Sequence, residues 1–473
     1  MSDLLLMIIL AMIILLFIIL LLMLIGWRWI MKRIVKKAGK ILFTDSYQEN
    51  LIEMIPGFRH LGVQNALENN LRAETGDVLH RPFGSSKKWP HFDEITFIPV
   101  QTTPFPLDGD EEVDVKVTIG PKAKKPMKIK IPLMVSGMAY GIALSEQVKI
   151  ALATAAKNTG TAINSGEGGI LPEELESAGK YILQFSKTEW GKEEELIKRA
   201  DMIELKLGQG AMQGMGGNIS PENLTGRARE IMGLKENETA QILEHFFDKQ
   251  TLKDLMDLVD ELRKLSGGVP IGAKIGAGGK IEADIDNLIE MGVDFIAIDG
   301  GQAATMGAPP ILADDFGIPT LHAVVRASRH LEKRKKKGEI SLIVSGGLFT
   351  PGQFLKVLAL GADAVYLGSV ILFTVSHLHT LNSLPFEPPT QAVWNQGKFK
   401  DSFKIDDGVK SAEKFLTAST EEIKMGLRAM GKRSLKELSK KDLVSYDELT
   451  AKMIGIPFTF EPYEDQHKKS DTN

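Results

Sequence analysis

Three charged side chains lie in glycine-rich stretches where they could carry out chemistry. Glu167 occurs in "INSGEGG", Lys206 in "ELKLGQG" and Lys274 in "GAKIGAG". Both lysines follow apolar residues, and a buried ammonium group must be paired because its desolvation is costly. Such a cation could stabilise negative charge on a reduced cofactor or on a substrate carboxylate. The structural alternative is that the lysines point outward and extend their charges to water.

Glu167 is a single acid between glycines. A carboxylate in a ligand-binding hollow can transfer a proton or hold an ammonium or imine nitrogen. The alternative is an acid at a turn or at the start of a helix.

These residues need a fold that brings the ends of several strands together. From Ile129 onward, apolar runs alternate with helical runs. The predicted fold class is therefore α/β, as a (β/α)8 TIM-type barrel. A Rossmann-type sheet is the alternative, but no G-x-G-x-x-G pattern follows the first strand. The eight predicted strands are 129–137, 161–169, 181–186, 202–210, 270–278, 295–301, 340–347 and 364–372.

Two glycine-containing turns follow the last two predicted strands. They are Ser345-Gly346-Gly347 and Leu367-Gly368-Ser369. Barrels commonly bind phosphate groups at these two strand ends, where main-chain N–H groups can approach the anion. The sequence therefore predicts a phosphate-binding site there.

The N-terminus predicts a membrane-spanning helix. Leu4 to Ile25 is an unbroken apolar run, long enough to cross a bilayer. Basic residues and two tryptophans follow it, which places the rest of the chain in the cytoplasm by the positive-inside rule. A cleaved signal peptide would need a basic start and a small-residue cleavage site. We expect a single-pass protein of the cell membrane.

Composition excludes several kinds of chemistry. The 473 residues contain no cysteine, which removes disulfides, thiolate nucleophiles and cysteine-ligated clusters. A net charge of −4 argues against a nucleic-acid partner. The histidines show no spacing typical of metal ligands, so we expect no metal.

Five stretches of sequence resemble the FMN-binding synthase domain of glutamate synthase. In order, they are "IPLMVSGMAYGIALSEQVKIALATAAKNTGTAINSGEGG", "IELKLGQGAMQGMGGNISPENL", "PIGAKIGAG", "FIAIDGGQAATMGAPP" and "SGGLFTPGQFLKVLALGADAVYLGS". The resemblance covers about 130–375. It implies an oxidoreductase acting on a CH–NH2 group, in which reduced FMN delivers hydride to 2-iminoglutarate, formed from 2-oxoglutarate and ammonia.

The resemblance also implies roles for individual residues. Glu167 would bind the substrate nitrogen or relay its proton, and Lys274 would approach the pyrimidine side of the flavin or the substrate. Asp299, Gly300 and Gly301 would stand near the substrate mouth. The catalytic candidates are Glu167, Lys274 and Asp299. The cofactor-binding candidates are Ser136, Gly137 and Met138 against the flavin ring, Lys206, Gln209 and Lys274 on the floor, and Gly346, Gly347, Gly368 and Ser369 at the phosphate.

The sequence also departs from the pattern of full glutamate synthases. Those proteins use a catalytic cysteine to release ammonia from glutamine and a cysteine-ligated iron–sulfur cluster to relay electrons. This chain contains no cysteine, so it has neither the catalytic residue nor the ligands of the cluster. We therefore expect the nitrogen to come from ammonia or an amine, and the electrons from a donor that the sequence does not identify. The stretch "DGGQAATMGAPP" departs from the shorter family pattern, so the substrate can be a related imine.

Other functions fit parts of the sequence. A non-catalytic, membrane-tethered flavin electron carrier is one, although carriage alone requires no acid–base pair. A 2-hydroxy acid oxidase would need a histidine base, but His322 and His330 lie in a helical run. An IMP dehydrogenase needs a cysteine, and a type 2 isopentenyl-diphosphate isomerase needs a basic diphosphate site that is not evident. A homo-oligomer is compatible with the sequence.

The expected organisation has four parts. Residues 1–30 form the transmembrane anchor and 31–128 a lead-in segment. Residues 129–375 form the FMN-binding barrel, and 376–473 form a helical C-terminal extension with a disordered tail.

Overall fold

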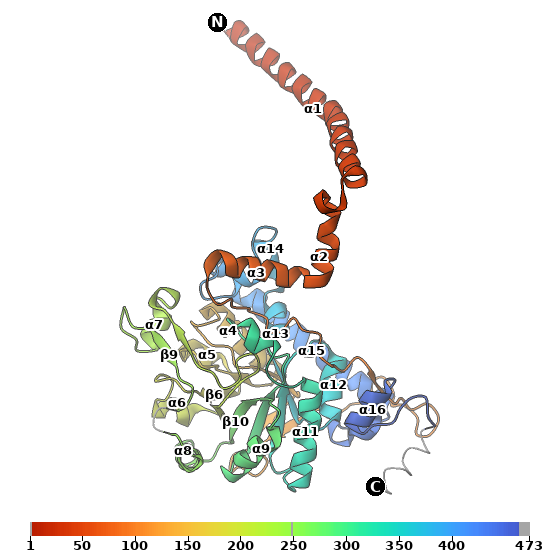
Figure 1. The fold of residues 1–473 in the computed structure, drawn as a ribbon. Helices are drawn as coiled ribbons and strands as arrows, with labels where there is room; N and C mark the ends of the chain where they lie inside the picture. Colours follow the sequence, from red (N-terminus) through yellow and green to blue (C-terminus); the bar gives the residue numbers. More distant parts are fainter. Residues whose placement is uncertain (1, 247–248, 463–473) are drawn as a thin grey trace. The chain divides into compact units, whose positions relative to one another are not determined.

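A computed structural model gives the structure of the chain and describes residues 2–246 and 249–462 (Figure 1). The chain divides into two compact units, residues 1–79 and 80–473. The predicted disordered tail at 464–473 lies outside the described residues.

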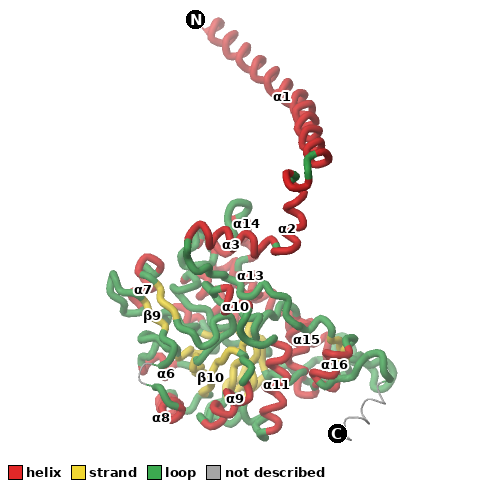
Figure 2. The backbone as a smooth tube through the Cα atoms, in the orientation of Figure 1, coloured by secondary structure: helices red, strands yellow, loops and turns green. Residues whose placement is uncertain are grey.

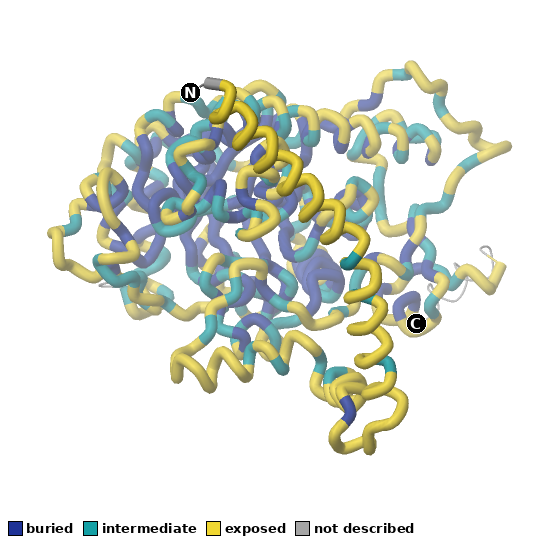
Figure 3. Tube along the Cα trace, turned by 90° about the horizontal axis from the view of Figure 1, so that it is seen from above, coloured by how far each residue is buried: buried dark blue, intermediate teal, exposed yellow. Residues whose placement is uncertain are grey.

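The first unit is helical. α1 (Ser2–Thr44) has the length and apolar composition needed to cross a membrane, and its apolar side chains are exposed (Figure 3). The helix continues past the predicted anchor, through the basic stretch, to Thr44. The shorter helical segments of this unit are η1 (Tyr47–Glu49), η2 (Leu51–Glu53), α2 (Met54–Leu61) and α3 (Val63–Thr75).

The second unit contains a closed barrel of eight parallel strands, which confirms the predicted fold (Figure 2). All eight predicted strands are present, and each is shorter than the predicted run. Most of the glycine-rich ends form loops, and residues 369–372 of the last predicted strand belong to a helix instead. Around the barrel the order is β10-β11-β12-β13-β4-β5-β6-β7. In chain order the strands are β4 (Leu133–Val135), β5 (Ile163–Asn164), β6 (Tyr181–Phe185), β7 (Met202–Lys206), β10 (Ile271–Gly276), β11 (Phe295–Asp299), β12 (Ser341–Ser345) and β13 (Ala364–Leu367).

Alternation along the strands separates the barrel interior from the helix-facing side. In β7, Ile203 and Leu205 belong to the large apolar core that the helices cover. Met202 packs in a separate cluster with residues from the other strands. Lys206 is therefore on the inward face, at the carboxyl end of the strand.

Helices surround the barrel. They form between the strands, where helical runs alternate with apolar runs in the sequence. The helices of the barrel region are α4 (Glu146–Thr159), α5 (Pro172–Ser177), α6 (Glu194–Arg199), α7 (Arg227–Ile231), α8 (Leu252–Leu265), α9 (Ile281–Glu290), α10 (Pro310–Asp314), α11 (Thr320–Lys333), α12 (Pro351–Ala359) and α13 (Ser369–Val375), with the short η3 (Pro221–Asn223).

A small hairpin closes the amino-terminal end of the barrel. Ile119, Met127 and Ile129 of this hairpin pack against interior residues such as Phe295 and Ile343. This end is filled with apolar side chains, so ligands can enter only at the carboxyl ends of the strands. The small two-stranded sheets are β2 (Val117–Ile119) with β3 (Met127–Ile129), β1 (Ile95–Phe97) with β14 (Leu443–Ser445), and β8 (Gly217–Ile219) with β9 (Ala240–Ile242).

The stretch "VKSAEKFLTASTEEIKMGLRAMGKRSLKEL" (409–438) predicts two amphipathic helices, but the C-terminal extension contains one long helix there. α15 (Ile405–Ala429) packs against α4, α12 and α13. The chain then turns at Gly431, where φ is +68°, and the predicted second helix is only a 3-10 turn. The other elements of the extension are α14 (Thr380–Ser383), α16 (Glu448–Ile454), η4 (His377–His379), η5 (Pro389–Ala392), η6 (Lys400–Ser402), η7 (Leu435–Glu437) and η8 (Lys440–Asp442).

Candidate active site

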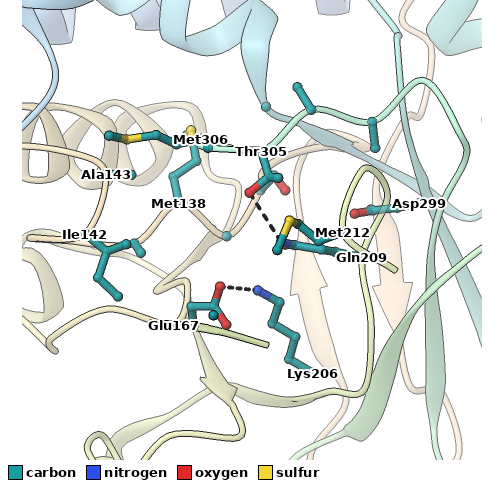
Figure 4. Close-up of a pocket in the computed structure, with 18 of the residues that line it drawn as sticks. Met138, Ile142, Ala143, Glu167, Lys206, Gln209, Met212, Asp299, Thr305 and Met306 are labelled. Carbon is teal, nitrogen blue, oxygen red and sulfur yellow. Dashed lines mark hydrogen bonds and ion pairs between the residues drawn. The ribbon is translucent and has the colours of Figure 1, made fainter. Parts of the chain in front are cut away.

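A cavity of about 610 Å³ lies at the carboxyl ends of the barrel strands. Its wall contains every catalytic and cofactor-binding candidate that the sequence suggested, whereas Gly300 and Gly301 are not among the lining residues. Figure 4 shows part of this cavity, including Glu167, Lys206, Gln209 and Asp299. The structure therefore brings the candidates together, and their individual roles stay predictions.

Glu167 and Lys206 form an ion pair inside the cavity (Figure 4). Lys206 ends β7 on the inward face, and Glu167 lies in the loop after β5. Both side chains are largely buried, with 10% and 15% of the lysine and glutamate side chains exposed. The indole Nε1 of Trp190 donates to the main-chain oxygen of Glu167 at 2.8 Å, which fixes the loop. The pair holds an acidic group at a defined point of the cavity wall.

Lys274 and Asp299 form a second pair, with Nζ 3.2 Å from Oδ2. They lie on the adjacent strands β10 and β11. The hydroxyl of Ser345 and the main-chain N–H of Gly210 donate to the Asp299 carboxylate. Burial lowers the pKa of Lys274, but the charges of Asp299, Glu204 and Glu167 outweigh that effect, so the net pKa is raised. Lys274 is therefore a cation at neutral pH.

Glu204 lies beneath these pairs, fully buried in the barrel interior. The amides of Asn164 and Gln184 each donate to its Oε1 at 2.8 Å, and the hydroxyl of Tyr366 donates to its Oε2 at 2.9 Å. Burial, followed by the charge of Glu204, raises the pKa of Tyr366 well above its usual value. The tyrosine therefore stays protonated and remains a donor. Glu204, Asn164, Gln184 and Tyr366 form a buried polar layer. Their side chains satisfy one another's hydrogen-bonding groups.

The glycine turns after β12 and β13 form an open corner of the cavity. Gly346 has a φ of +119°, and a Cβ at this position would lie 2.6 Å from Oγ1 of Thr320. A Cβ on Gly368 would meet no atom within 4 Å. Gly368 and Ser369 begin α13, and the first N–H groups of a helix have no partner inside the helix. These main-chain donors suit a phosphate group.

Sequence reasoning missed several residues of the cavity wall. Lys187 lies two residues beyond the end of β6, and its Nζ donates to the carbonyl oxygens of Glu244 at 2.7 Å and Gly214 at 3.1 Å. Burial and then the charge of Lys206 lower its pKa. A signal was available, because Lys187 lies just beyond an apolar strand, close to the position at which Lys206 ends β7. No comparable signal marks Met212 or Met306, which lie in loops.

The histidines lie in several environments. Nδ1 of His80 is 2.8 Å from the carbonyl oxygen of Gly307, at the edge of the cavity. His330 pairs with Asp286 at 2.7 Å and does not line the cavity, nor does His322. Within the described ranges, no group of three or more His, Cys, Asp or Glu side chains is arranged to hold a metal ion.

Comparison with known protein families gives one match that covers most of the chain. Residues 85–433 match the model of the family described as "Conserved region in glutamate synthase". The match includes the whole barrel and all of α15.

Individual relatives share this description. A glutamate synthase large subunit-like protein of Rhizobium meliloti is 29% identical over 408 residues, covering 81% of this chain and 91% of the relative. An archaeal-type glutamate synthase [NADPH] of Thermotoga maritima is 28% identical and covers 81% of each chain. The archaeal glutamate synthase [NADPH] of Archaeoglobus fulgidus is 31% identical, covering 64% of this chain and 63% of the relative.

Solved structures resemble the fold. The flavin-binding domain of baker's yeast flavocytochrome b2 aligns with a TM-score of 0.50 at 18% identity, covering 80% of this chain and 82% of that one. At this identity the similarity concerns the barrel alone.

Proposed function

Since this chain belongs to the family of the conserved region in glutamate synthase, we propose that it is an FMN-dependent oxidoreductase that reduces an imine to an amino acid. The imine is 2-iminoglutarate, formed from 2-oxoglutarate and ammonia, or a related imine formed from a 2-oxo acid and an amine. The observation that carries the proposal is the pairing of Glu167 with Lys206, inside the cavity that also contains the open glycine corner.

The cavity fits FMN. The main-chain N–H groups at Gly346, Gly347, Gly368 and Ser369 would hold the phosphate, and the Ser136–Met138 loop lines the same cavity. The ammonium group of Lys274 also lines the cavity and would favour negative charge on a bound ring system. When bound, FMN supplies hydride to the acceptor.

The Glu167–Lys206 pair suits an imine substrate. A protonated imine nitrogen is a cation, and the carboxylate of Glu167 would hold it by charge and hydrogen bonding. Nζ of Lys206 has three N–H donors, so it can contact Glu167 and still donate to a substrate carboxylate. Hydride addition to the carbon of a protonated imine gives the neutral amine directly, so the two side chains need only orient the acceptor and keep its nitrogen protonated.

Two alternatives receive less support from the site. A flavin electron carrier requires no carboxylate–ammonium pair in its cavity, yet this cavity contains two such pairs. A 2-hydroxy acid oxidase would need a histidine base. Neither His322 nor His330 lines the cavity, and His80, which does, lies at its edge with Nδ1 2.8 Å from the carbonyl oxygen of Gly307. The pairs therefore favour an enzyme acting on a nitrogen-containing acceptor.

The proposal includes the membrane. α1 would cross the bilayer with the barrel on the cytoplasmic side, in keeping with the basic residues that follow the apolar run. A membrane-associated donor would then supply electrons. The chain has no cysteine for amide hydrolysis, so free ammonia or an amine supplies the nitrogen.

The first test uses the full chain extracted in detergent. Its visible spectrum is recorded, the flavin is reduced chemically without oxygen, and reoxidation is followed with 2-oxo acids, alone and with ammonia or methylamine. The expected result is reoxidation only when acid and amine are both present, with an amino acid as product. Bound flavin that no such pair reoxidises would support the carrier instead.

A further inference from the structure

Four lysines are buried among the described residues, and three of them have a carboxylate partner. The three ion pairs are Lys149–Glu174, Lys206–Glu167 and Lys274–Asp299. Lys187 is the fourth. It is only 7% exposed, and its Nζ donates to two main-chain carbonyl oxygens, those of Gly214 and Glu244. A buried ammonium group without a counter-ion is costly, so this position is suited to an anion that the chain itself does not supply.

The carbonyl oxygens fix the ammonium group of Lys187 but do not use all of its donors. An ammonium group has three N–H donors, and the two carbonyls accept from two of them. The main-chain oxygen of Lys187 also accepts from the N–H of Leu243 at 3.0 Å, so both the backbone and the side chain are held. One donor therefore remains for a ligand in the cavity that Lys187 lines.

The charges around Lys187 also favour an anion. Burial and then the charge of Lys206 lower the pKa of Lys187, and the charges of Glu167 and Glu244 offset this only in part. A carboxylate bound beside the ammonium group would oppose both effects. Lys187 thus lies within electrostatic reach of the Glu167–Lys206 pair.

The strand order places Lys187 on the side of the barrel that carries this pair. Around the closed barrel, β6 lies between β5 and β7. Glu167 lies in the loop after β5 and Lys206 ends β7, so Lys187, just beyond β6, comes between them. The glycine turns proposed for the phosphate follow β12 and β13, which lie opposite β6 and β7 in the ring of eight strands. Lys187 is therefore available to the acceptor and not to the phosphate.

We propose that Lys187 is a specificity-determining residue whose ammonium group binds the second carboxylate of a dicarboxylic acceptor. In the proposed function, Glu167 holds the imine nitrogen and Lys206 holds the first carboxylate. The inference rests on that function and assigns the residue that selects a dicarboxylic acceptor, such as 2-iminoglutarate, over the imine of a monocarboxylic acid.

Binding can be measured without turnover. Isothermal titration calorimetry of the oxidised, full-length protein in detergent would compare 2-oxoglutarate with 2-oxopentanoate as probes. Both acids carry the 2-oxo carboxylate and have the same chain length, but 2-oxopentanoate ends in a methyl group instead of a second carboxylate. We expect 2-oxoglutarate to bind at least about tenfold more tightly, because hydrogen bonds to charged groups are the stronger ones.

Substitutions of Lys187 test its role directly. Lys187→Gln keeps N–H donors for the carbonyl oxygens but removes the charge. We expect K187Q to lose about tenfold or more in affinity for 2-oxoglutarate, while its affinity for 2-oxopentanoate and its flavin content stay unchanged. Lys187→Arg keeps the charge and should retain the preference for 2-oxoglutarate. Lys253→Gln is the matched control, because Lys253 is exposed on α8 and does not line the cavity.

The outcomes separate the two proposals. A preference for 2-oxoglutarate that K187Q loses, and that K187R and K253Q keep, supports the inference. Equal binding of the two acids by the unmodified protein overturns it and leaves the proposed function standing. A K187Q protein that binds both acids more weakly by the same factor also overturns it, because Lys187 would then only hold the loops in place. Binding of neither acid by an unmodified protein that carries its flavin overturns both proposals.

Discussion

Lys149 and Glu174 form an ion pair enclosed within the protein, with Nζ of Lys149 2.9 Å from Oε1 of Glu174. Their side chains are 1% and 0% exposed. The same ammonium group donates to the main-chain oxygens of Met138 at 2.7 Å and Ser165 at 2.9 Å. Lys149 therefore ties together the two loops that present Met138 and Glu167 to the cavity. The pair is a structural support for the candidate active site.

This pair predicts a pH dependence of stability. Burial, only partly offset by Lys149, raises the pKa of Glu174 from 4.5 to about 7. A carboxyl group whose pKa is higher in the folded state binds more protons when folded, so its contribution is full below pH 4.5 and is lost as the pH rises through 7. We expect the free energy of unfolding of E174Q, relative to that of the wild type, to rise by about 3 kcal/mol between pH 4.5 and pH 8.

Denaturant unfolding at both pH values measures this difference. Glu176 is exposed on the same helix, so E176Q serves as the control and should follow the wild type. A constant difference between E174Q and wild type across this pH range would contradict the prediction.

Glu167→Gln should separate catalysis from cofactor binding. The amide keeps the size of the side chain but loses the charge that would hold a protonated imine and that now pairs with Lys206. We expect the reoxidation rate with acid and amine to fall by about 10²-fold or more, while flavin content stays unchanged. The exposed Glu189 lies outside the cavity, so E189Q should keep the full rate. Loss of flavin from E167Q would show that Glu167 supports the cofactor instead.

Gly346→Ala should weaken flavin retention. At φ +119° an L-residue is strained, and the added methyl group would collide with Thr320. We expect the purified variant to hold less flavin, as measured by the ratio of visible to ultraviolet absorbance. Gly278→Ala is the control, because a Cβ there meets no atom within 4 Å. Equal flavin content in both variants would exclude a role for the Gly346 turn in binding.

Removal of residues 1–44 tests the proposed anchor. The deletion takes away α1 and leaves the second compact unit untouched. We expect the shortened protein to leave the membrane fraction while keeping its flavin spectrum and melting temperature. A shortened protein that still sediments with membranes would place the attachment elsewhere.

The sequence predicts the barrel because local residue patterns mark the positions of its strands. Runs such as "YILQF" and "FIAID" are apolar and end at glycine, serine or aspartate, so local patterns locate β6 and β11. The same logic found Lys206 and Lys274, since inward-facing lysines interrupt apolar strands. The carboxylate partner of each lysine comes from a different strand or loop, and alternation in one strand carries no information about it.

The three methionines that line the cavity and the Lys149–Glu174 pair could not be found in this way. Met138, Met212 and Met306 come from three loops whose spacing shows no period, and only barrel closure brings them together. Lys149 and Glu174 lie on helical runs where a charged residue normally predicts an exposed face. The sequence predicts two amphipathic helices over 409–438, whereas a single helix, α15, covers most of this run and the chain turns at Gly431.

The hydrogen bonds of Glu204 bear on how this barrel assembles. Its donors come from β5, β6 and β13, and β13 is the last barrel strand in the chain. Until β13 pairs with β4, a chain that has formed the earlier strands buries the Glu204 carboxylate without the hydroxyl donor of Tyr366. The unsatisfied carboxylate raises the free energy of an incomplete barrel. Closure of the barrel therefore couples the first strand to the last. The polar layer below the active site thus makes folding cooperative across the whole ring of strands.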